Sequence, residues 1–187
     1  MSARLSFLFL LAACGGAQGG GEAASMNPSD FYPMSEGSVW SYDVDTHTGE
    51  PPVLAVLQVR EVQGQTYTIA NNGDEATRYE LRPEGIWNAD GEVWLLRAPL
   101  EVGQEWASLG GRRARIAALD ESVETAMGTQ EDCIRVDEAG GADGRTISTA
   151  YCRGLGMAHQ HVVMRMDTGG EAVLDVVLRG YLSGPTL

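Results

Sequence analysis

Apolar and polar residues alternate with a period of two along most of the chain beyond residue 38. This spacing places successive side chains on opposite faces of an extended backbone, and it is typical of β-strands that bury one face. No segment carries apolar residues at the spacing of an amphipathic helix. The alternation predicts strands over residues 39–44, 53–62, 65–70, 77–81 and 93–97, and less regular strands over 113–119 and 133–136.

Clusters of asparagine, aspartate and glycine separate these segments, at residues 71–74, 88–91 and 140–144. Such residues accept the positive φ angles of tight hairpins. A further turn at 167–170 joins the two longest segments, 157–166 and 172–182. We therefore expect an all-β fold, in which one antiparallel, strongly curled sheet of about ten strands forms a half-barrel or a barrel. A two-sheet β-sandwich is the alternative.

The N-terminus has the features of an export signal. Arg4 precedes a short apolar run over residues 5–13, and small residues lead to Cys14. The run is too short to cross a hydrocarbon core, which needs about 20 residues. The residues Leu11-Ala12-Ala13-Cys14 resemble the lipobox of bacterial lipoproteins, which implies cleavage before Cys14 and lipidation of this cysteine. An ordinary signal peptide, cleaved after an A-x-A-like site, is the alternative.

Three parts of the chain follow from this interpretation. Residues 1–13 are a lipoprotein signal peptide, residues 14–27 are the lipidated cysteine and a glycine-rich tether, and residues 28–187 are a single β domain. The tether spans about 20 Å as a flexible coil. Gly15, rather than an aspartate, follows Cys14. We therefore expect a cell-envelope protein that is attached to the outer membrane through its lipid anchor.

The chain is strongly acidic, with 26 aspartate and glutamate residues against 13 basic ones and a net charge of -13. Every basic residue is an arginine. The absence of lysine from the sequence excludes a P-loop lysine and a Schiff-base lysine. The acid excess repels phosphate backbones, so nucleic acid is not an expected partner.

Cys133 and Cys152 remain as a pair once Cys14 is lipidated. They lie at nearly equal distances from the turn at 140–144, so a hairpin brings them face to face or one register step apart. Exported proteins pass into an oxidising setting. We expect a cross-strand disulfide between Cys133 and Cys152, and two buried free thiols are the alternative.

His159 and His161 are the one weak metal-binding signal. Residues two apart on a strand point to the same face, so both imidazoles could bind one ion. The sequence lacks a carboxylate ligand at the expected spacing downstream, where Arg165 and Met166 stand. No catalytic or phosphate-binding motif occurs in the body of the chain, and the carboxylates are scattered. We expect no cofactor, no metal and no catalytic site.

Four stretches resemble uncharacterised bacterial envelope lipoproteins sometimes called TapB-like. Tyr32-Pro33-Met34-Ser35-Glu36-Gly37-Ser38-Val39-Trp40-Ser41-Tyr42 resembles their opening Y-P-L-x-x-G-x-x-W-x-Y, and residues 99–106 resemble P-L-x-x-G-x-x-W. Residues 127–133 and 151–157 are similar to the elements A-G-T-F-x-x-C and Y-A-P-G-V-G-L, although Gln130 replaces an aromatic residue and Cys152-Arg153 replaces Ala-Pro. The resemblance implies an all-β envelope domain, and the family supplies no catalytic residues to carry over.

Trp40, Tyr42 and Trp106 stand in these motifs. Trp40 and Tyr42 fall on the same face of the first predicted strand. Large aromatic side chains anchor protein cores, and exported β domains also bind ligands through them. We interpret these three residues as core anchors, with a ligand platform as the alternative.

The leading hypothesis is a non-enzymatic lipoprotein whose β domain binds an apolar ligand or an envelope partner protein. A concave inner face lined with apolar side chains would hold acyl chains, whereas a filled interior would leave an interaction module. The alternative is a metal-dependent envelope enzyme that uses His159 and His161.

Overall fold

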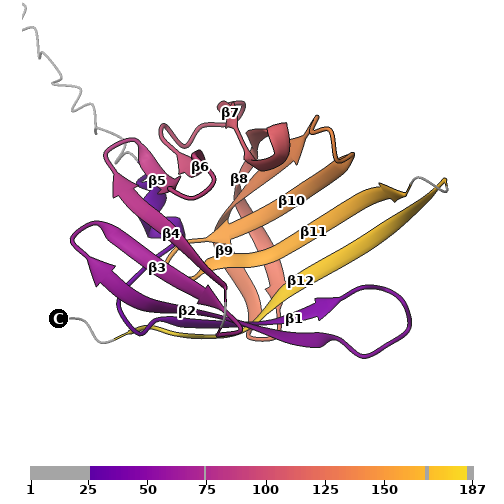
Figure 1. The fold of residues 1–187 in the computed structure, drawn as a ribbon, viewed down its shortest axis with the longest axis horizontal. Helices are drawn as coiled ribbons and strands as arrows, with labels where there is room; N and C mark the ends of the chain where they lie inside the picture. Colours follow the sequence, from indigo (N-terminus) through magenta and orange to yellow (C-terminus); the bar gives the residue numbers. More distant parts are fainter. Residues whose placement is uncertain (1–25, 74, 167–168, 185–187) are drawn as a thin grey trace, which may run out of the picture.

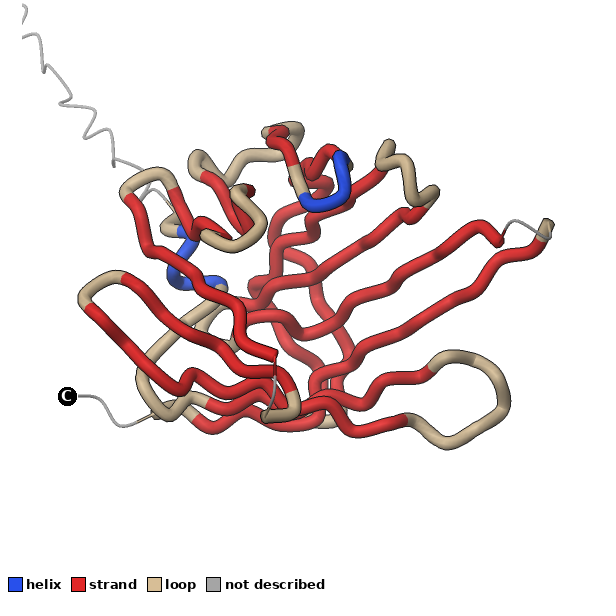
Figure 2. The backbone as a smooth tube through the Cα atoms, in the orientation of Figure 1, coloured by secondary structure: helices blue, strands red, loops and turns tan. Residues whose placement is uncertain are grey.

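A computed structural model describes residues 26–73, 75–166 and 169–184. The signal peptide, Cys14 and the tether up to residue 25 lie outside the described residues. Strands form most of the described backbone, as Figure 2 shows, with loops and two short 3-10 helices between them. The elements in chain order are η1 (Pro28–Phe31), β1 (Val39–Asp45), β2 (Val53–Gln63), β3 (Thr66–Asn71), β4 (Glu75–Arg82), β5 (Gly85–Asn88), β6 (Val93–Arg97), β7 (Glu105–Ala107), η2 (Leu109–Gly111), β8 (Arg113–Thr125), β9 (Gly128–Ala139), β10 (Arg145–Cys152), β11 (Gly156–Met166) and β12 (Gly170–Leu182).

The twelve strands form one antiparallel sheet in the order β6-β5-β4-β3-β2-β1-β12-β11-β10-β9-β8-β7. Two meanders, β1 to β6 and β7 to β12, meet where β1 pairs with β12, and the sheet curls strongly (Figure 1). The predicted all-β, antiparallel curled sheet is confirmed, with twelve strands instead of about ten. The β-sandwich alternative is wrong, because the strands belong to a single sheet.

The sequence predicts no range for β5, β7 or β10, and β10 enters only through the hairpin expected to bring Cys133 and Cys152 together. β5 and β7 contain four and three residues and are too short to show an alternating pattern. β5 lies next to β6, the strand at one edge of the sheet, and β7 is the strand at the other edge. The chain joins these two edges by passing directly from β6 to β7. Across this seam the indole Nε1 of Trp106 donates a hydrogen bond to the backbone oxygen of Trp94 at 3.0 Å. The seam brings the sheet close to a complete barrel.

Aromatic side chains fill the interior of the barrel. Tyr32 stacks on Trp40 with ring centroids 5.3 Å apart and meets Tyr151 edge-on at 6.2 Å. The η1 helix packs against β5 and β11 and buries Phe31 completely. The other large side chains that are almost fully enclosed include Tyr42, Ile86, Leu96, Ile116, Ile134 and Leu178.

The hairpin of β8 and β9 bends over the outer face of the sheet. Asp120 and Asp132, near the bend, have φ angles of 57° and 56°, and the β8–β9 register shifts in the same region. Beyond the bend, the backbone N–H of Ala126 donates to the oxygen of Leu178 on β12 at 3.1 Å. The outer half of this hairpin therefore crosses β10 and β11 and reaches β12.

Candidate functional site

All three histidines of the chain contact one carboxylate, that of Asp175 on β12. Nε2 of His47 lies 2.6 Å from Oδ2, while Nε2 of His159 and Nδ1 of His161 lie 3.1 and 2.8 Å from Oδ1. His161 and Asp175 are register partners on β11 and β12, and His47 reaches the same carboxylate from the β1–β2 loop. We call these four residues the histidine cluster.

The cluster holds Asp175 in its ionised form. Partial burial by itself raises the pKa of this carboxyl, but hydrogen bonds from His161, His47 and His159 outweigh burial and lower the pKa to about 2. In return, the hydrogen bond to Asp175, with the nearby charge of Asp45, raises the pKa of His47 above its ordinary value. The contact between His47 and Asp175 therefore stabilises both the imidazolium of His47 and the carboxylate of Asp175.

A groove of about 380 Å³ lies beside the cluster, between the bent β8–β9 hairpin and the outer face of β9 to β11. Arg135 pairs with Glu121 of the hairpin at 3.1 Å, and Ser148 donates to Asp137 at 2.7 Å. The groove is lined by Glu121, Ser122, Val123, Glu124, Arg135, Ser148, Ala150, His159 and His161. Seven of these nine residues are polar or charged, and they carry both signs of charge.

His159 and His161 both face this groove, as their spacing on one strand implies. Their ring nitrogens meet a carboxylate oxygen, and among the described residues no group of three or more His, Cys, Asp or Glu side chains is placed to hold a metal ion. The metal-dependent enzyme therefore gains no support from the arrangement of these side chains. What the cluster can do chemically is take up protons beside a fixed negative charge.

The interior of the barrel holds a second, smaller candidate site. A cavity of about 150 Å³ is lined by Tyr79, Asn88, Val93, Trp94, Leu95, Ser108, Leu109, Arg112, Glu138, Ile147, Tyr151 and Gln160. Arg112 is only 8% exposed, and its guanidinium pairs with Glu138 at 3.3 Å and with Asp143 at 2.7 Å. Burial raises the pKa of Tyr79 to about 12, so its phenol is neutral at physiological pH. The walls of the cavity are part apolar and part polar, and it has room for water or a very small solute.

The three aromatic residues of the sequence motifs lie in the core. Trp40 is fully buried, and its Nε1 donates to the backbone oxygen of Leu155 at 2.6 Å. Tyr42 is buried, and its hydroxyl has no hydrogen-bond partner among the described residues. Trp106 is buried at the seam. None of the three presents its ring on the protein surface.

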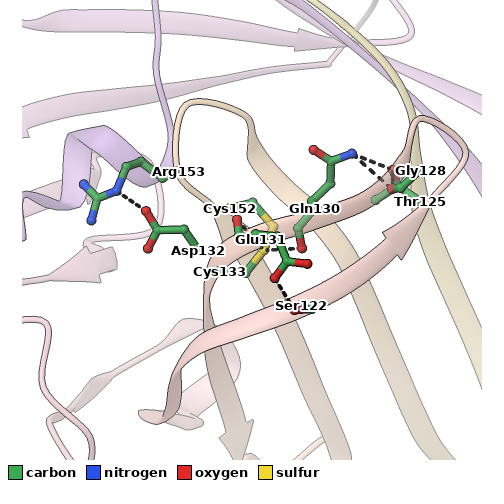
Figure 3. Close-up of a disulfide and its surroundings, with 9 residues drawn as sticks. All are labelled: Ser122, Thr125, Gly128, Gln130, Glu131, Asp132, Cys133, Cys152 and Arg153. Carbon is green, nitrogen blue, oxygen red and sulfur yellow. Dashed lines mark hydrogen bonds and ion pairs between the residues drawn. A yellow bond between two sulfur atoms is a disulfide. The ribbon is translucent and has the colours of Figure 1, made fainter.

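Cys133 and Cys152 form a disulfide on the outer face, under the bent hairpin (Figure 3). The two residues are direct register partners on β9 and β10, and both are fully buried. Next to them, Arg153 donates to Asp132 at 2.6 Å and to Asp30 at 2.9 Å. This ion-pair network ties the β10–β11 turn to η1 and to β9.

Two residues of the histidine cluster, His47 and Asp175, have no role in the sequence-based prediction. They are 128 positions apart, and their contact depends on the pairing of β1 with β12. A turn centred near residue 168 would have suggested Asp175 as the cross-strand partner of His161. Nothing in the local sequence around His47 indicates its partner.

Neither a protein-family model nor a curated protein matches the chain. Two solved structures resemble it. A "putative exported protein with YmcC-like fold" from Bacteroides fragilis is 13% identical with a TM-score of 0.47, and the match covers 82% of this chain and 99% of that one. A "putative lipoprotein" from Parabacteroides distasonis is 12% identical with a TM-score of 0.40, and covers 81% and 98%. At these scores the likeness supports no inference about function or location.

The helices of the described residues are short. Within residues 26–73, 75–166 and 169–184, none has the length and apolar character that a membrane-spanning helix requires.

Proposed function

We propose that the chain is a lipoprotein anchored in the outer membrane through Cys14, and that its β domain is a non-catalytic module that binds another envelope protein. We choose a protein partner over an apolar ligand because the interior of the barrel is filled. Phe31, Tyr32, Trp40 and Tyr151 occupy the space in which an acyl chain would lie.

The inner cavity lined by described residues such as Tyr79 and Arg112 supports the same choice. Its volume is about 150 Å³, whereas pockets for small-molecule ligands measure roughly 300–1,000 Å³. A cavity near 150 Å³ holds a molecule of about the size of benzene. Its lining mixes apolar and polar side chains, and the ion pair of Arg112 and Glu138 in it is poorly suited to a hydrocarbon chain.

The outer surface is the part left for recognition. It is acidic and has no lysine, with 26 carboxylates against 13 arginines in the whole chain. Complementary charge raises the rate of encounter and disfavours partners of like charge. We therefore expect a partner with a basic surface. The tether of residues 14–27 keeps the domain close to the membrane, where such a partner would be met.

The proposal is tested with the full-length chain expressed in a Gram-negative host. The expected result is recovery in the outer-membrane fraction, loss of membrane attachment in Cys14→Ala, and a native mass of the extracted protein without bound lipid in the domain. Crosslinking in intact cells should yield one stoichiometric protein adduct, and the yield of this adduct should fall as the salt concentration rises.

Three results would overturn the proposal. A non-covalently bound lipid in the native mass would replace the interaction module with a lipid carrier. Wild-type and Cys14→Ala proteins that fractionate alike would remove the anchor. Crosslinking that yields only random adducts, at the level found for an unrelated anchored domain, would remove the partner.

A further inference from the structure

The loop between β1 and β2, residues 46–52, is attached to its surroundings by very little. Every residue in it is exposed. Its hydrogen bonds are local, between the hydroxyls of Thr46 and Thr48 and from the N–H of His47 to Asp45 at 2.8 Å. Among the described residues, the 2.6 Å bond from His47 to Asp175 is the hydrogen bond that ties this loop to another strand.

His47 has a positive φ, which is uncommon for residues other than glycine, although histidine, asparagine and aspartate accept it more often than most. Its φ is 53°, in the left-handed region that asparagine and glycine adopt more readily. The backbone conformation at residue 47 does not require histidine. What histidine adds at this position is the imidazole that reaches Asp175. This makes His47→Asn a suitable variant for tests, because asparagine tolerates the same φ and carries no titratable ring.

Protonation changes the strength of this contact. A neutral imidazole donates a single N–H to the carboxylate, whereas an imidazolium adds an ion pair to the same hydrogen bond. The pKa of His47 is raised by its bond to Asp175, so the contact is stronger when the ring is protonated. The pKa of the carboxyl lies near 2, so Asp175 stays charged throughout the range in which histidine titrates.

Two carboxylates, those of Asp45 and Asp175, favour a proton on His47, and protons on the neighbouring histidines oppose it. Asp45 lies 3.9 Å from Nδ1 of His47, and Asp43 on the same strand is paired with Arg179 at 3.0 Å. His159 and His161 share the other carboxylate oxygen of Asp175, so protons on those rings would repel the one on His47. The titratable and charged groups near the cluster are Asp43, Asp45, Glu50, Glu121, Glu124, Arg135, Asp137, His159, His161, Asp175 and Arg179.

We infer that the histidine cluster is a proton-operated latch, in which protonated His47 clamps the loop of residues 46–52 onto Asp175 and deprotonation releases it. The geometry that carries this inference is a single contact in a loop that is otherwise unattached. Among the described residues, His47 is the titratable side chain of this loop that reaches another strand, and its partner there is the carboxylate of Asp175. The loop then responds to pH between about 5 and 8. The inference does not depend on the proposed interaction function.

The test measures hydrogen exchange of the loop amides in the full-length protein in detergent, from about pH 5 to pH 8.5, with rates divided by the intrinsic rates at each pH. The pKa of each histidine is measured in parallel by NMR. The latch predicts that protection of residues 46–52 falls as the pH rises through the pKa of His47. The fall is about tenfold for each unit by which that pKa exceeds the unfolded value.

Variants separate the latch from other causes. In His47→Asn the loop should have low protection that is independent of pH, and in Asp175→Asn the pKa of His47 should return toward its ordinary value. Asp43→Asn is the matched control, because it breaks the neighbouring pair with Arg179 and leaves the cluster intact. This variant should keep the pH transition.

The latch would be overturned by loop protection that does not change with pH, or by a transition that persists in His47→Asn. It would also be overturned if protection follows added Zn²⁺ at constant pH instead of the proton concentration. Should Asp175→Asn fail to fold, the variant His47→Asn still decides the question, since the side chain of His47 is 47% exposed and lies in an exposed loop.

Discussion

Removing the disulfide between Cys133 and Cys152 should lower the stability of the domain by an amount that its loop length sets. The bridge joins positions 19 apart in the sequence. In the chain-entropy model, closing a loop of this length restricts the unfolded chain enough to contribute about 3 kcal/mol. A domain with a total stability of about 5–15 kcal/mol loses a large part of it with such a bond.

The assay is equilibrium urea unfolding, followed by tryptophan fluorescence, for the oxidised wild type and for Cys133→Ala/Cys152→Ala. Both cysteines are fully buried and pack against Ala158 with Val123 and Leu155 alongside. Alanine avoids a buried hydroxyl in this cluster, although the smaller side chain adds a modest cavity cost. The free energy of unfolding from the urea curves should be about 3 kcal/mol lower in the double variant. In thermal unfolding the same loss corresponds to a melting temperature lower by about 6–12 °C, since about 1 kcal/mol corresponds to about 2–4 °C at this chain size.

Reductant supplies the matched control. Wild type in reductant should unfold near the midpoint of the double variant, while the double variant should not respond to reductant at all. The reasoning would be refuted if the oxidised and reduced wild-type proteins unfold at the same urea concentration. A count of two free thiols in the purified, unfolded protein would equally refute it, because it would restore the alternative of two buried cysteines.

Three further predictions concern the seam, the core and the pH dependence. Trp106→Phe removes the indole donor to the Trp94 oxygen and should cost about 1–3 kcal/mol in urea unfolding, and an unchanged midpoint would mean that the bond does not hold the seam. Gly156→Ala should be destabilising by more than about 1 kcal/mol, since φ is 94° and the added Cβ would lie 3.1 Å from Nε1 of Trp40; calorimetry showing a higher melting temperature would contradict this. The lowered pKa of Asp175 contributes stability that is complete above the ordinary pKa of 3.8 and is lost as the pH falls toward 2. The contribution is about 1–2 kcal/mol after solvent screening. The unfolding free energy of Asp175→Asn should therefore fall less steeply between about pH 4 and pH 2 than that of wild type.

The alternating pattern predicts most strands because each buries one face against the barrel interior. Residues 93–97 and 157–166 are examples in which prediction and structure agree to within one residue. The closure of the barrel has no such signal, since it depends on contacts of Trp106 and on two strands of three and four residues. The bend of the β8–β9 hairpin is also hidden, because aspartates, and not glycines, take the positive φ angles near it.

The candidate site was predictable only in part, for a related reason. The spacing of His159 and His161 on one strand fixes that they share a face. The identity of their partner depends on the β11–β12 register, in which a slip of one residue would turn Asp175 to the opposite face. The contribution of His47 depends on a loop conformation between two strands, which periodicity does not report.

The intact mass of the protein extracted from bacterial membranes tests the central claim most directly. The account predicts a chain that begins at Cys14 and carries covalent lipid, with a mass lower by two hydrogen atoms for the Cys133–Cys152 bridge, and a native mass that shows no further lipid in the domain. A chain with an unmodified Cys14, or a domain that retains a non-covalently bound lipid, would contradict the account of an anchored domain with a filled barrel.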